Sequence, residues 1–177
     1  MKKYLLLLAV VFSLNGFSQW GANINFVSYT IKAEIGVEGA TVSDSEDYSG
    51  FSLGLDYGFK MDNLKLVAGL SADFVDVEGD NETIITPSVM VKYPISDVIG
   101  VKGGFSLPTW DVDDGDGIKA SILHLPLGLD YSLSEKVSLT AQYSIALGNR
   151  FKGDVDFSSD ELKITDNNLR FGIHFNF

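Results

Sequence analysis

The densest group of reactive side chains in the sequence is a run of four aspartates interspersed with glycine. The segment reads Asp111-Val112-Asp113-Asp114-Gly115-Asp116-Gly117. Clustered carboxylates on a chain that can turn suit a hard cation such as Ca²⁺. An EF-hand loop, however, needs an acid at its fifth position and Glu at its twelfth, where this sequence has Gly115 and Ile122. We therefore predict a solvated acidic loop without a defined metal site, in which the candidate ligands would be Asp111, Asp113, Asp114 and Asp116.

Histidine is the other residue type that could carry out chemistry, and the chain has two, His124 and His174. A histidine paired with a serine and an acid would support hydrolysis, but the strand pattern described below places both histidines on polar faces, next to ordinary partners. Two histidines exclude a three-histidine zinc site. The lack of cysteine excludes disulfides, thiolate metal sites and a cysteine nucleophile. We therefore predict no catalytic residues, no cofactor and no enzymatic activity.

The composition bounds the class of protein. The chain has 177 residues and a formal net charge of −11, and 45% of its residues are hydrophobic. This length suits one domain, and the apolar fraction is too high for a disordered chain. A protein that binds nucleic acid needs a basic surface to neutralise phosphates, so we expect no nucleic-acid partner.

The N-terminus has the three parts of a secretory signal peptide. A positive head of two lysines precedes the apolar residues 4–14, and small residues stand at Gly16 and Ser18. The apolar part is too short to cross a bilayer as a helix. The sequence therefore predicts a signal peptide over residues 1–18 and one exported domain over residues 19–177.

Alternation of apolar and polar residues recurs eight times in the exported domain. The apolar residues hold every second position of eight segments, the even positions of 64–74 and the odd positions of 27–37, 51–61, 85–95, 99–107, 123–133, 137–147 and 169–177. Such alternation predicts strands with one apolar face, and about ten residues suffice for a tilted strand to cross a bilayer. No segment keeps a helical period. The predicted fold is all-β, an eight-stranded antiparallel up-and-down transmembrane β-barrel.

The connections between these segments alternate in length. Short turns lie at residues 62–63, 96–98 and 134–136, and longer loops at 38–49, 76–83, 111–117 and 149–166. In outer-membrane barrels the short turns are periplasmic and the long loops extracellular. The long loops hold 17 of the 24 acidic residues, so we expect a strongly acidic outer surface that attracts cations.

Two local features qualify this pattern. Residues 20–26 and 118–122 carry their apolar side chains at even positions, which we interpret as a bulge or as a strand end beyond the apolar band. Aromatic residues gather near the short turns, as in an interfacial girdle, and Trp110 is expected in the girdle at the other end.

The polar faces decide between a membrane barrel and a soluble calycin-like barrel, which also alternates. They are rich in Gly and Ser, which suit a crowded interior, whereas a face in water would carry long charged side chains. The apolar faces hold no charge, as expected in lipid, where Lys or Arg at mid-depth costs roughly 2–4 kcal/mol. We therefore predict a filled lumen lined by a polar network: Lys32, Glu34, Asp56, Lys60, Lys65, Asp73, Lys92, Lys102, Asp130 and Arg170.

The C-terminus alternates apolar residues and ends in an aromatic one. This ending resembles the signal that the barrel-assembly machinery recognises in outer-membrane β-barrels. With its eight segments, the chain resembles the OmpX and OmpA-transmembrane-domain class of the outer membrane β-barrel family. The resemblance implies location in the cell outer membrane, contact with its lipid and lipopolysaccharide, and an assembly signal made of Leu169, Phe171, Ile173, Phe175 and Phe177.

The function that these observations favour is non-enzymatic. We expect a structural or surface-interaction role in which the acidic extracellular loops contact an external partner or attract divalent cations. Three alternatives remain: a narrow passive channel, a lipid A-modifying enzyme that uses His174, and a soluble exported barrel.

Overall fold

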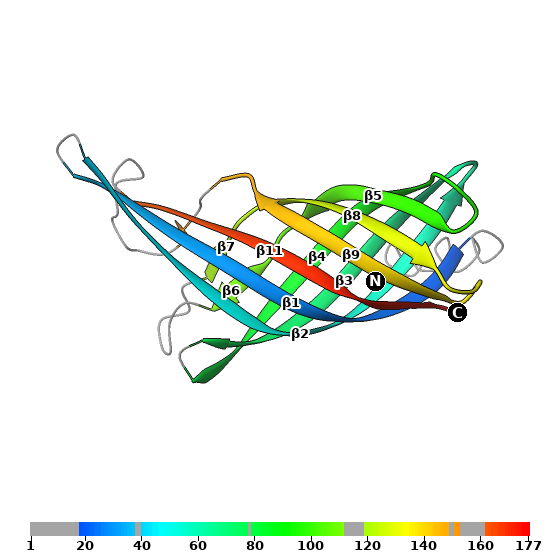
Figure 1. Ribbon diagram of the computed structural model, residues 1–177, viewed down its shortest axis with the longest axis horizontal. Helices are drawn as coiled ribbons and strands as arrows, with labels where there is room; N and C mark the ends of the chain where they lie inside the picture. Colours follow the sequence, from blue (N-terminus) through cyan, green and yellow to red (C-terminus); the bar gives the residue numbers. More distant parts are fainter. Residues whose placement is uncertain (1–17, 38–39, 78, 112–118, 149–150, 153–161) are drawn as a thin grey trace, which may run out of the picture.

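The computed structural model describes residues 18–37, 40–77, 79–111, 119–148, 151–152 and 162–177, which are coloured in Figure 1. Residues 1–17 of the predicted signal peptide and residues 112–118, which hold most of the acidic segment, lie outside the described residues. The described residues include no helix long and apolar enough to cross a membrane.

The regular structure of the described residues consists of strands. Their bounds are β1 Ser18–Val37, β2 Ala40–Met61, β3 Leu64–Val77, β4 Asp80–Pro94, β5 Ile99–Ser106, β6 Thr109–Asp111, β7 Lys119–Ser121, β8 His124–Ser132, β9 Val137–Ala146, β10 Phe151–Lys152 and β11 Leu162–Asn176. The pairing register is the same on both sides of the break between β5 and β6, and of the break between β7 and β8. Each of these pairs therefore forms one interrupted strand.

The sheet closes on itself into a barrel (Figure 1). Antiparallel pairing runs from β1 through β2, β3, β4, β5, β8 and β9 to β11, and β11 pairs with β1. Over the described residues this ring has eight strands, which confirms the predicted up-and-down barrel. Two predicted loops were wrong, because most of residues 38–49 and 76–83 continue the strands β2, β3 and β4.

The outer surface of the barrel is apolar and its interior is polar. Leu55, Leu127 and Phe171 are 60%, 48% and 55% exposed, whereas Lys102 and Asp73 are 9% and 0% exposed. A soluble barrel would show the opposite arrangement, so that alternative is wrong. The exposed apolar band is the surface that a transmembrane barrel presents to lipid.

In strand β1, the structure corrects the prediction of which side chains face lipid and which face the lumen. Ile24 and Phe26 are exposed, whereas Val27 and Tyr29 are fully buried inside the barrel. The register of β1 with both neighbours is unbroken from Gly21 onward, so the strand has no bulge. The apolar side chains move from the outer to the inner face while the strand geometry stays regular. Val27 and Tyr29 therefore face the lumen, and the prediction that they face lipid was wrong.

An apolar cluster that we call the outer plug explains this change of face. Val27, Tyr29, Val75 and Ile84 form its buried centre. Tyr48, Val77 and Trp110 pack against them, and the ring centroids of Tyr29 and Trp110 are 5.2 Å apart. Trp110 is thus an interior residue, and its predicted place in the aromatic girdle was wrong.

Close contact between β1 and β11 leads to a first prediction. A Cβ atom at Gly172 would lie 2.0 Å from the carbonyl oxygen of Ile24, whereas one at Gly148 would have open space. Because backbone cannot yield as a side chain does, we expect Gly172→Ala to lower the free energy of unfolding by about 1–3 kcal/mol. Urea titration in detergent micelles measures this change. Gly148→Ala is the control, and an equal loss in both variants would contradict the prediction.

Candidate functional site

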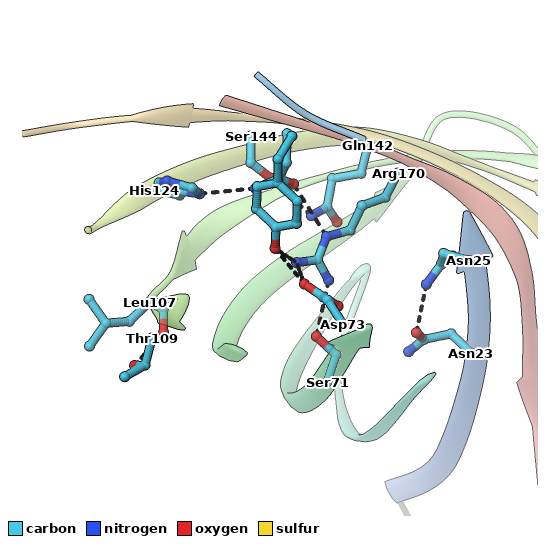
Figure 2. Close-up of polar contacts among 12 residues, drawn as sticks. Asn23, Asn25, Ser71, Asp73, Leu107, Thr109, His124, Gln142, Ser144 and Arg170 are labelled. Carbon is cyan, nitrogen blue, oxygen red and sulfur yellow. Dashed lines mark hydrogen bonds and ion pairs between the residues drawn. The ribbon is translucent and has the colours of Figure 1, made fainter. Parts of the chain in front are cut away.

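A buried ion pair between Asp73 of β3 and Arg170 of β11 lies inside the barrel (Figure 2). Asp73 Oδ2 accepts hydrogen bonds from Arg170 Nη2 and from the Tyr29 hydroxyl, both at 2.5 Å. Arg170 Nη1 donates to Ser71 Oγ at 3.0 Å, and Nε donates to Asn168 Oδ1 at 3.2 Å. We call these five residues the Arg170 network. It links β1, β3 and β11 and gives the buried guanidinium the partners that it needs.

His124 extends this network toward β8. Its side chain is fully buried, with Nε2 2.8 Å from Asp166 Oδ1 and Nδ1 3.1 Å from Asn168 Nδ2. Asn168 Oδ1 already accepts from Arg170, so its amide nitrogen donates to His124 Nδ1. His124 in turn keeps a proton on Nε2 and donates it to Asp166. Both ring nitrogens are engaged, which leaves His124 without a free position for acid–base catalysis.

Two further ion clusters lie closer to the short turns. Asp130 of β8 is 3.0 Å from the ammonium groups of both Lys92 and Lys102. Lys102 also donates a hydrogen bond to Thr140. The second cluster joins β11 and β2, where His174 Nε2 and Asp56 Oδ2 are 2.8 Å apart.

Two cavities lie beside these groups. A small one of about 60 Å³ lies among Asp56, Arg170 and Lys102 and has room for a few water molecules. A second, of about 1180 Å³, opens at the end of the short turns and reaches inward to Lys92, Asp130 and His174. We call the second cavity the vestibule. Side chains of the Arg170 network and the outer plug lie buried in the lumen beyond them.

The structure brings together most of the predicted lumen residues. Asp56, Asp73, Lys92, Lys102, Asp130 and Arg170 have ionic partners inside the barrel. Lys65 reaches the vestibule, where its ammonium group contacts the side-chain oxygens of Gln19 and Asn176 at 3.2 and 3.3 Å. Lys60 is exposed at the rim of the vestibule.

Lys32 and Glu34 are placed elsewhere, which corrects the predicted network. They lie on the outer face of β1, beyond the apolar band, and form an ion pair of 2.6 Å with each other. The inverted face of β1 is the reason, because even positions of this strand point outward.

The sequence analysis missed three residues of the polar interior, Tyr29, Asp166 and Asn168. Tyr29 was assigned to the lipid-facing surface, Asp166 to a loop, and Asn168 to no role. Continuing the alternation of β11 backward from Arg170 would have placed Asn168 and Asp166 inside.

The sequence also contains a serine motif that is typical of hydrolases. Gly50-Phe51-Ser52-Leu53-Gly54 matches the Gly-x-Ser-x-Gly pattern of hydrolases. That pattern has meaning only at a sharp turn between a strand and a helix, and here it lies within β2. Among the described residues, Ser52 Oγ has no hydrogen-bond partner. The match therefore does not form a nucleophile site.

The remaining predicted residues fall into two groups. Asp111 ends β6, and Asp113, Asp114 and Asp116 lie outside the described residues. Within the described ranges no group of three or more His, Cys, Asp or Glu side chains could hold a metal ion. The residues of the predicted assembly signal lie on β11 and at the C-terminus, with Leu169, Phe171, Ile173 and Phe177 exposed on the outer surface.

Several solved structures are similar to this chain. Among solved structures, Neisserial surface protein A is 14% identical, over 88% of this chain and 99% of that one, with a TM-score of 0.48. Ail, the attachment invasion locus protein of Yersinia pestis, solved with the heparin analogue sucrose octasulfate, is 14% identical over 90% and 99%, with a TM-score of 0.46. The outer membrane protease OmpT of Escherichia coli is 10% identical over 90% and 97%, with a TM-score of 0.40.

No curated protein matches the chain. A family model does, over residues 4–177, and its description is outer membrane protein beta-barrel domain. The match covers the whole barrel described above, with its apolar exterior and its paired ions inside. The chain is therefore a member of the outer membrane protein beta-barrel family and resides in the outer membrane.

Proposed function

We propose that this outer-membrane barrel is non-enzymatic and acts at the cell surface, where the hairpin of β1 and β2 binds an extended basic segment of an external protein. The hairpin supports this role because it continues far past the barrel wall (Figure 1). β1 and β2 pair up to Val37 and Ala40, whereas β3 pairs with β2 only from Ser49. Over residues 40–47, β2 has no strand partner on its other side within the described part of the chain.

A strand edge of this kind can accept another strand through backbone hydrogen bonds. The edge is acidic, since Asp44, Glu46 and Asp47 are all exposed. Thr30 Oγ1 donates a hydrogen bond of 2.7 Å to Asp47 across the hairpin. Such cross-strand contacts hold the edge in an extended shape before a partner arrives, which lowers the entropic cost of binding. Opposite charge favours a basic partner.

Two alternatives receive less support. A passive channel would need an open lumen, but the outer plug and the Arg170 network occupy it. A lipid A-modifying enzyme would need a catalytic histidine that reaches lipid. His174 instead faces the vestibule and bonds to Asp56, and His124 has both nitrogens engaged.

Export and assembly are part of the same proposal. Residues 1–18 would direct secretion, after which β11 would be recognised by the barrel-assembly machinery. The outward side chains of Leu169, Phe171 and Ile173 support the second step, because they remain accessible on the outer surface of the last strand. Divalent cations would be attracted by the same acidic outer surface.

The proposal is tested with a synthetic decapeptide of alternating Lys and Val. We expect it to bind the purified barrel and to shift the backbone amide NMR signals of residues 40–47. Asp44→Lys with Glu46→Lys should weaken binding about tenfold, because like charges then oppose each other. Asp97→Lys with Glu135→Lys, the same charge change in the short turns at the other end, is the control. Equal weakening in both variants, or shifts elsewhere, would contradict the proposal.

A further inference from the structure

Four lysines form a row across the inner wall of the barrel at the end of the short turns. Lys60 of β2 is the cross-strand partner of Lys65 of β3, Lys65 is the partner of Lys92 of β4, and Lys92 is the partner of Lys102 of β5. Like charges placed directly opposite on one face of a sheet repel each other. We call this arrangement the lysine row. Repulsion makes it unfavourable for folding, so stability does not explain its presence.

The lysine row carries more charge than its surroundings neutralise. Lys92 and Lys102 share a single carboxylate, that of Asp130. The other inner carboxylate described at this end of the barrel, Asp56, is bonded to His174. In the described part of the chain, the ammonium group of Lys65 has hydrogen bonds only to neutral oxygens, those of Gln19 and Asn176. At this end of the described barrel, two inner carboxylates thus face four ammonium groups, of which that of Lys60 is exposed, although the whole chain has a net charge of −11.

Further acids lie at the edge of the vestibule. Asp62, Asp97 and Glu135 line it from the turns. All three are exposed to water, as Lys60 is, and solvent and salt screen their effect on groups deeper inside. Among the less exposed groups at this end, Lys65, Lys92 and Lys102 face the carboxylates of Asp56 and Asp130, which leaves an excess of positive charge on the wall of β3 to β5.

The vestibule gives this charge a space in which a ligand fits. Its volume of about 1180 Å³ slightly exceeds the roughly 300–1,000 Å³ of small-molecule sites, so it has room for a small ligand. Lys60, Lys65 and Lys92 line it together with hydroxyl donors from Ser132 and Ser138. Neighbouring strands are about 4.8 Å apart, so adjacent ammonium groups can contact different oxygens of one polyanion. Lysine ammonium groups bind phosphate as point charges.

We propose that the lysine row and the vestibule form a binding site for a small anion with two or more phosphate charges, such as a diphosphate, which enters from the periplasmic end. The site lies at the opposite end of the barrel from the sheet edge proposed above and does not depend on it. Lys65 is its central residue, because it lies between two other lysines and has no carboxylate partner of its own among the residues that the structure describes.

Isothermal titration calorimetry of the full barrel, purified in a phosphate-free zwitterionic detergent, tests this with inorganic pyrophosphate at constant ionic strength. We expect saturable binding of one pyrophosphate per barrel. Lys65→Gln should weaken it at least tenfold, and Lys60→Gln should weaken it as well. Since neither lysine has a carboxylate partner among the described residues, both variants should keep the same difference in gel mobility between unboiled and boiled samples as the wild-type barrel.

Lys136→Gln is the matched control, because it removes the same charge from an exposed turn at the same end of the barrel. It should change the affinity less than twofold. Equal weakening by Lys65→Gln and Lys136→Gln would mean diffuse attraction and would overturn the proposal. A wild-type barrel that shows no saturable binding would overturn it too. Binding of citrate as tightly as pyrophosphate would overturn the assignment to phosphate.

Discussion

Asp73→Ala is expected to lower the free energy of unfolding by about 3–5 kcal/mol, the largest effect of any single substitution considered for this barrel. Asp73 is fully buried and Arg170 is 8% exposed. Removing the carboxylate leaves the guanidinium without its counter-ion and the Tyr29 hydroxyl without its acceptor, and an unpaired buried charge is strongly destabilising. Urea titration of the barrel in lipid vesicles, followed by the gel mobility of unboiled samples, measures the change.

A combined variant separates the loss of the ion pair from the exposure of its partner. Asp73→Leu with Arg170→Met and Tyr29→Phe replaces the charged centre with apolar side chains of similar size. Such replacements are often neutral or stabilising, so this variant should recover most of the lost stability. Asp97→Ala, in an exposed turn, should change stability by less than about 0.5 kcal/mol. A combined variant as unstable as Asp73→Ala would mean that packing, and not the uncompensated charge, is the cause.

Leu55→Arg is expected to destabilise the barrel in a bilayer by about 2–4 kcal/mol. Leu55 is 60% exposed on the outer face of β2 and lies midway along the apolar band, beside Leu70 and Ala22 on the neighbouring strands. A guanidinium at this depth must leave water or distort the bilayer around it. Reversible unfolding by guanidinium chloride in lipid vesicles measures this loss.

Met61→Arg provides the depth control for this experiment. Met61 is exposed to a similar extent, 59%, but it borders the turn at Asp62. The penalty near the interface is about 0–1 kcal/mol. If both variants lost the same stability, the apolar band would not be spanning lipid at the depth inferred from its sequence.

The barrel was predictable because its two faces differ along most of the strands. Where lipid lies outside and polar groups lie inside, alternation identifies both the strand and its orientation, as it does for Leu55 and Lys102. The rule failed for Val27 and Tyr29, because an apolar residue in the outer plug has the same pattern as one in lipid. Lys32 and Glu34 were misplaced by the same error.

Alternation also disappears where both faces are in water, which is why residues 40–49 looked like a loop. The pairing of ions depends on register, and register was only partly readable. Lys60 and Lys65 flank the Asp62 turn symmetrically, so their proximity follows from the hairpin. The approach of Lys65 to Lys92 depends on the second hairpin, whose strands extend well beyond the apolar band. Contacts across the lumen, such as that of Asp73 with Arg170, require the closed barrel itself.

The seam between β1 and β11 has a consequence for how the molecule is made. Gly21 pairs with Asn176, so almost the entire polypeptide separates the two strands that complete the ring. A ribosome must therefore finish the chain before any closed species can exist. Contacts so distant in sequence make folding slow, and until they form every intermediate has two bare strand edges open to mispairing. We expect the newly secreted chain to require a holding chaperone on its way to the membrane.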